Sequence, residues 1–166
     1  LDQHCDVVDT DWIETLYGYM DREGVSAVAP VLIDEFGTIV SAGLSLSPVP
    51  HDIGLGWQSS DLGPVGMFAI ARECFGVSTR CALLDVAAVK KTGGLSPEYT
   101  SRLVDFDLAC KLHENDRHSI VTPLVKVRLF DEVSDMADDM KLFISRWGHY
   151  IGDDPYTRVD TRRQET

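Results

Sequence analysis

The sequence predicts an α/β protein in which a mixed sheet is flanked by helices. Short apolar runs alternate along the chain with segments of helical periodicity, and this alternation is typical of layered α/β structures. The length of 166 residues suits a single domain. The composition, 44% hydrophobic and 25% charged, is that of a globular chain that can form a core.

The first part of the chain predicts a helix followed by two strands. Asp11 and Glu14 have the spacing of a capping box, and the apolar residues that follow recur at helical intervals up to Gly24. The run 25–33 is continuously apolar, which predicts a strand buried on both faces. Residues 34–43 then predict a turn and a second short strand.

The middle of the chain predicts a long loop and a further strand and helix. Residues 45–66 are rich in proline and glycine, and loops of this length are often functional. A strand is expected over 81–84, and a helix from Asp85 that stops at Gly93 and Gly94.

The last part predicts two helices around one strand. Asp105 or Asp107 is expected to cap a helix that begins near Phe106. Residues 123–130 alternate between apolar and basic side chains, which predicts a half-buried strand. A final helix is expected over 138–150. The domain thus covers 1–157, with a flexible tail over 158–166.

Charge and composition exclude several classes of protein. The formal net charge of −12 argues against nucleic-acid binding, which needs a basic face. No apolar stretch approaches the ~20 residues of a membrane span.

The four cysteines are widely spaced, so we expect free thiols in a cytoplasmic protein, with a peripheral position at the inner membrane face as a second option. Four histidines without ligand-like spacing are expected at the surface: His51, His113, His118 and His149.

Five segments, in order, resemble the second half of a family-2 glycosyltransferase of the GT-A fold, close to its rhamnosyltransferase-like members. The resemblance spans nearly the whole chain and implies the acceptor-side half of that fold. The segments are "LDQHCDVVDTDWIETL", "VSAVAPVLIDEFGTIVSAG", "CALLDVAAVKKTGGLSPEY", "LVDFDLACKL" and "SRWGHYIGDDPY".

The opening segment stands where this family has its Asp-x-Asp motif, which implies a site for a divalent cation. Asp2 matches the first position, and His4 replaces the second Asp. "DQHCD" is also similar to the Asp-x-His motif of polypeptide N-acetylgalactosaminyltransferases. The resemblance implies Mn²⁺ or Mg²⁺ bridging the donor diphosphate, and imidazole suits Mn²⁺ better. The alternative is a solvated acidic strand end.

"LVDFDLACKL" stands where the family has its Glu-Asp-x-Asp-Leu motif. Asp105 matches the catalytic base, while Val104 replaces the Glu. A base of this kind takes the proton from the acceptor hydroxyl as that hydroxyl attacks the sugar. The alternative is that Asp105 only caps its helix. The resemblance and the tendency of aromatic rings to stack on sugars also suggest a set of acceptor-binding residues. These residues are Trp57, Gly93, Gly94, Arg146 and Trp147. For both tryptophans the alternative is a position in the core.

Two functions follow from this resemblance. The first is an inverting glycosyltransferase, or part of one, which transfers a sugar from a nucleotide-activated donor to a glycan hydroxyl, as in polysaccharide biosynthesis. The second is a non-catalytic glycosyltransferase-like module for binding or assembly. In this family the nucleotide pocket precedes the Asp-x-Asp motif, so we expect either a missing upstream half-domain or a homo-oligomer that covers the exposed sheet edge.

Overall fold

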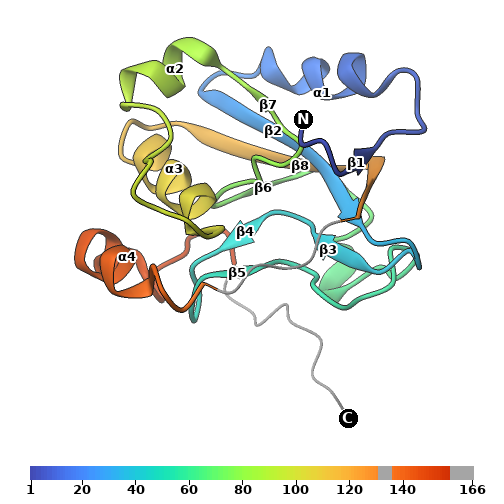
Figure 1. The fold of residues 1–166 in the computed structure, drawn as a ribbon. Helices are drawn as coiled ribbons and strands as arrows, with labels where there is room; N and C mark the ends of the chain where they lie inside the picture. Colours follow the sequence, from blue (N-terminus) through green and yellow to red (C-terminus); the bar gives the residue numbers. More distant parts are fainter. Residues whose placement is uncertain (131–135, 158–166) are drawn as a thin grey trace.

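A computed structural model describes residues 1–130 and 136–157 and shows a mixed α/β architecture around a curled, six-stranded sheet (Figure 1). The two long central strands, β2 (Val25–Ile33) and β8 (His118–Leu129), run parallel. Short antiparallel strands flank them, β7 and β3 along β2, and β6 and β1 along β8. Their bounds are β1 (Cys5–Asp6), β3 (Ile39–Ser41), β6 (Arg72–Cys74) and β7 (Leu83–Leu84). A separate two-stranded sheet pairs β4 (Leu44–Ser45) with β5 (His51–Asp52).

Helices cover both faces of the large sheet. Helix α1 (Trp12–Met20) buries Leu16 against one face, and α3 (Leu103–His113) packs Leu108 and Leu112 against the other. Helix α4 lies against α3 on the side away from the sheet (Figure 1). The other helical segments are α2 (Val86–Lys91), α4 (Met140–Trp147), and the 3₁₀ turns η1 (Pro64–Gly66) and η2 (Gly148–Tyr150).

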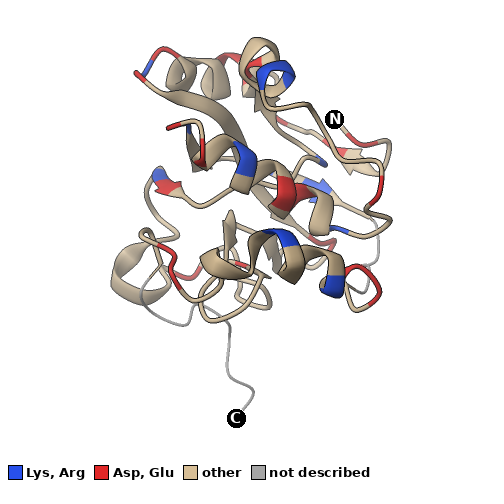
Figure 2. Cartoon of the chain, turned by 90° about the vertical axis from the view of Figure 1, so that its left-hand side faces the viewer, with Lys and Arg blue, Asp and Glu red and all other residues tan. Residues whose placement is uncertain are grey.

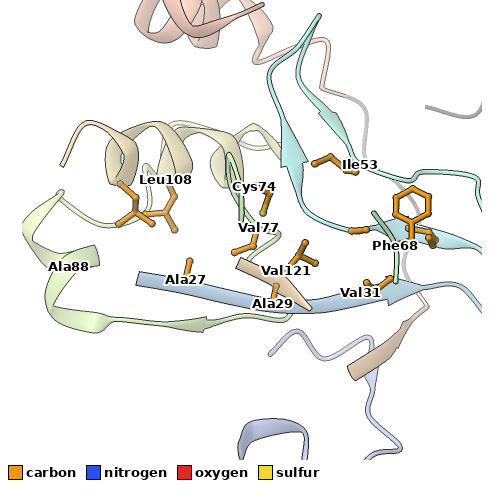
Figure 3. Packing of buried hydrophobic residues seen from close by; sticks show 13 residues of the cluster. Ala27, Ala29, Val31, Ile53, Phe68, Cys74, Val77, Ala88, Leu108 and Val121 are labelled. Atoms are coloured by element: carbon orange, nitrogen blue, oxygen red, sulfur yellow. The ribbon is translucent and has the colours of Figure 1, made fainter. Parts of the chain in front are cut away.

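Strand β2 is buried on both faces, as its continuous apolar run predicted. Ala27, Ala29 and Val31 belong to the cluster beneath α3, while Val28 and Leu32 pack on the α1 side. Figure 3 shows the first of these clusters, in which the small side chains of β2 face the residues of α3 and of the loops. Because successive side chains of a strand point to opposite faces, a strand between two layers is mostly apolar on both faces.

Strand β8 is longer than the sequence pattern predicted. Its second half alternates as expected, with Val125, Val127 and Leu129 buried and Lys126 exposed. The strand, however, begins at His118 rather than near 123. The extra residues lie between two layers and are buried on both faces, so they carry no alternating signal.

Two predicted helix caps differ from the structure. Asp11 occupies the N-cap position of α1, but its side chain makes no capping hydrogen bond. Asp105 and Asp107 do not cap α3, because that helix begins at Leu103 with Arg102 at the cap, and both carboxylates are buried inside it. Asp85 does cap α2, accepting hydrogen bonds from two backbone N–H groups. The final helix is shorter than predicted, since α4 ends at Trp147 and continues as a 3₁₀ turn.

The sequence also led to predictions about membrane spans, cysteines, histidines and the C-terminal tail. Within 1–130 and 136–157, no helix is long and apolar enough to cross a membrane. All four cysteines are free thiols, as predicted. His51 is buried rather than exposed, which corrects the surface assignment, because it lies in the small β4–β5 sheet and its Nδ1 contacts the Val49 carbonyl at 2.8 Å. The predicted flexible tail lies outside the described residues.

Candidate functional site

The Asp-x-His segment forms a compact turn before β1. The Asp2 carboxylate accepts a hydrogen bond from the His4 backbone N–H at 2.8 Å and lies 2.9 Å from His4 Nδ1. The backbone hydrogen bond from His4 holds the pKa of Asp2 below its ordinary value. The side chains of Asp2 and His4 are 35% and 45% exposed, so both can reach a ligand from solvent.

Asp105 lies in the first turn of α3 and is 3% exposed. Its two carboxylate oxygens accept hydrogen bonds from Ser78 Oγ at 3.1 Å and from Thr79 Oγ1 at 2.5 Å. Burial raises the pKa of Asp105, although the hydroxyl hydrogen bonds and the nearby Arg102 oppose this shift. Asp105 also lines a cavity of about 10 Å³ under α3, which is roughly the space one water molecule needs.

The segment 78–80 connects these two groups. Its hydroxyls hold Asp105, and the carbonyl of Arg80 accepts a hydrogen bond from the Asp2 backbone N–H at 2.6 Å. Cys5 Sγ contacts the same carbonyl at 3.6 Å. The predicted metal-binding turn and the predicted base are therefore both hydrogen-bonded to one three-residue segment.

Three of the predicted acceptor residues, Gly94, Arg146 and Trp147, lie around Asp107 rather than Asp105. The fully buried Asp107 carboxylate accepts hydrogen bonds from Trp147 Nε1 at 2.8 Å and Ser96 Oγ at 2.7 Å, and pairs with Lys111 Nζ at 2.7 Å. The Lys111 ammonium also donates to the Gly94 carbonyl at 2.9 Å. This Asp107 network joins α3, α4 and the loop between α2 and α3.

Burial alone would raise the pKa of Asp107, but the hydrogen bonds from Lys111, Trp147 and Ser96 outweigh it, so its pKa lies below the ordinary value. Arg146 pairs with Glu98 at 3.1 Å and lies over the Tyr99 ring. Trp147 is buried, and its indole N–H donates to Asp107. It therefore occupies a core position, which was the alternative prediction for this residue.

Two predicted acceptor residues, Gly93 and Trp57, take no part in this network, whereas Gly94 joins it through its carbonyl. Gly93 and Gly94 end α2 with positive φ angles of 89° and 76°, a conformation that favours glycine. Trp57 packs edge-on against Phe68 at a ring distance of 5.8 Å, beside the core under α3. Its Nε1 is buried and has no hydrogen-bond partner among the described residues.

Sequence patterns did not reveal the polar groups that position Asp105. Ser78 and Thr79 lie just before the strand that is expected over 81–84, and neither belongs to a recognisable sequence motif. Arg102 and Asp52 form a buried ion pair at 2.5 Å, although 50 positions separate them in the chain. Such pairs become visible only once the fold brings distant segments together.

Asp2 and His4 bring one carboxylate and one imidazole together in the turn before β1. No group of three or more His, Cys, Asp or Glu side chains in the described ranges is arranged to hold a metal ion. Two protein ligands suit Mg²⁺ or Mn²⁺, which commonly complete their shells with water and phosphate oxygens. Comparison with protein-family models, with curated proteins and with solved structures finds no match for this chain.

Proposed function

We propose that this chain is the acceptor-side part of an inverting family-2 glycosyltransferase of the GT-A fold. In this proposal Asp2 and His4 hold a divalent cation against the diphosphate of a nucleotide-sugar donor. Asp105 takes the proton from the hydroxyl of a glycan acceptor. When a cation is bound there, it offsets the negative charge that develops on the leaving diphosphate.

One structural observation supports this proposal in addition to the motif resemblance. The Asp2–His4 turn and the Asp105 carboxylate, a hundred positions apart in the chain, both hydrogen-bond to the segment 78–80. A sugar-transfer site needs such proximity, because the metal-bound diphosphate and the base act on opposite sides of one anomeric carbon. The raised pKa of Asp105 also suits a general base, since it moves the carboxyl toward neutral pH.

The hydroxyls of Ser78 and Thr79 have a defined part in this proposal. They fix the plane of the Asp105 carboxylate and can exchange their hydrogen bonds for one from an acceptor hydroxyl. Substrate must reach a carboxylate that is 3% exposed, so binding has to displace one of the covering groups. The same burial favours the second candidate, a non-catalytic module in which Asp105 is purely structural.

A transfer assay with matched variants separates these two functions. The complete gene product, with any residues that precede Leu1, is incubated with Mn²⁺, a panel of nucleotide sugars and oligosaccharide acceptors, and nucleoside diphosphate release is measured. We expect Asp105→Asn to lower the rate by about 10²- to 10⁴-fold, the usual contribution of a general base. The control Glu35→Gln, on an exposed turn, should have no effect. A complete gene product that binds glycans but releases no diphosphate would support the non-catalytic module instead.

A further inference from the structure

On the side of β8 away from β2, the described part of the chain provides strand partners only near the two ends of this strand. On this side β6 pairs with residues 119–121 and β1 pairs with residues 128–129. Within the described ranges no strand covers the residues between them. A β-bulge interrupts the pairing with β2 over the same stretch, between Thr122 and Lys126. The gap leaves an open groove beside the segment that follows β1.

This groove has exposed apolar side chains on both walls. It measures about 440 Å³ and is lined by Val8, Asp9, Pro123, Leu124 and Lys126. Val8 is 71% exposed and Leu124 is 67% exposed. Single exposed apolar residues are common on proteins, but two that line one groove form a surface that gains free energy when a partner covers it.

The surroundings of this groove are acidic. Residues 1–21 contain six Asp and Glu residues and no Lys or Arg, and the acidic positions are coloured red in Figure 2. Asp9 lines the groove and Asp11 follows it, and both are exposed. Two basic residues lie nearby: Lys126 Nζ donates to the Ser59 carbonyl at 2.8 Å, and Arg128 is the cross-strand neighbour of Asp6 in β1.

We propose that this groove docks a basic segment of a partner protein, with one apolar side chain inserted between Val8 and Leu124 and a Lys or Arg beside Asp9 and Asp11. The acidic surface repels nucleic acid and anionic lipid, which rules against those ligands. A second copy is disfavoured for the same reason, because each chain carries a net charge of −12. The inference does not depend on sugar transfer.

Peptide binding to the full chain tests this proposal. The probe is a short synthetic peptide of alternating Arg and Leu with a neutral fluorescent label, and binding is followed by fluorescence anisotropy. We expect a Kd tighter than about 1 mM, with weaker binding as salt is added. The same peptide with Glu in place of Arg should not bind.

Matched variants locate the site. Leu124→Asn should weaken binding by about tenfold or more, whereas Leu62→Asn makes the same change at a residue that is 66% exposed elsewhere, and should change it less than about twofold. Asp9→Asn, which carries little risk to folding, should weaken binding by about two- to fivefold.

Three outcomes would overturn the proposal. The first is no binding of the Arg–Leu peptide, and the second is an equal effect of Leu124→Asn and Leu62→Asn. The third is a dimer in sedimentation experiments that Leu124→Asn dissociates, which would make a second copy the occupant of the groove.

Discussion

Two carboxylates two positions apart on α3 should respond in opposite ways to the same substitution. Asp107→Asn replaces a charge that pairs with Lys111 and accepts hydrogen bonds from Ser96 and Trp147. An ammonium and an indole can only donate, so the new amide N–H₂ cannot satisfy them. Asp105→Asn instead faces the hydroxyls of Ser78 and Thr79, which can accept as well as donate.

The magnitude for Asp107 follows from its burial. Removing one partner of a buried ion pair costs about 3–5 kcal/mol. Lys111 is 18% exposed and regains some hydration, so we expect the lower end, about 3 kcal/mol. With an m-value of about 1–3 kcal/mol/M, this loss lowers the urea midpoint by about 1–3 M. Asp105→Asn should leave the midpoint unchanged or raise it, because burial disfavours the charged form of Asp105.

The pH dependence provides an independent check on Asp107. Its pKa is depressed in the folded state, so its contribution is present above the unfolded pKa of about 3.9 and is lost as pH falls through the folded value. The stability difference between the protein and Asp107→Asn should thus be full at neutral pH and shrink below about pH 4. Urea unfolding followed by tryptophan fluorescence measures both effects. A loss of less than 1 kcal/mol for Asp107→Asn, or a larger loss for Asp105→Asn, would refute the reasoning.

Two further predictions concern packing and thiol reactivity. Gly76→Ala should destabilise the fold by about 1–3 kcal/mol, because its Cβ would lie 2.3 Å from that of Ala109. The control Gly18→Ala has open space within α1 and should stabilise by about 0.5–1 kcal/mol, and thermal unfolding compares the two. Iodoacetamide at pH 8 should label Cys5 before Cys81. Burial raises the pKa of the Cys81 thiol to about 12 and shields it from the reagent, whereas Cys5 is partly exposed. Mass spectrometry of the native protein showing Cys81 labelled before Cys5 would contradict this burial.

Periodicity predicted the parts of the fold that repeat along the chain. It located the first helix, the doubly buried β2 and the alternating half of β8, since in each case local spacing reflects which face is covered. It misplaced the start of α3, because the carboxylates at Asp105 and Asp107 have the appearance of caps. Their burial depends on Ser78, Thr79 and Trp147, and these contacts form only when distant segments meet.

The candidate site was predictable as residue types and not as an arrangement. The motif resemblance selected Asp2, His4 and Asp105, and the structure adds the segment 78–80 that lies between them. It also separates Arg146 and Trp147 from Asp105 by assigning them to the Asp107 network. No sequence pattern indicated the groove beside β8, because it arises where none of the described strands pairs with the middle of β8.

The central claim is that the Asp2–His4 turn and Asp105 belong to one cation-dependent site around the segment 78–80. Paramagnetic broadening of backbone amide signals by Mn²⁺ tests it most directly, with Mg²⁺ as the diamagnetic control. We predict that Mn²⁺ broadens the signals of His4, Thr79 and Asp105, and that His4→Ala removes this broadening. Broadening that is absent from these residues, or that persists unchanged in His4→Ala, would contradict the claim.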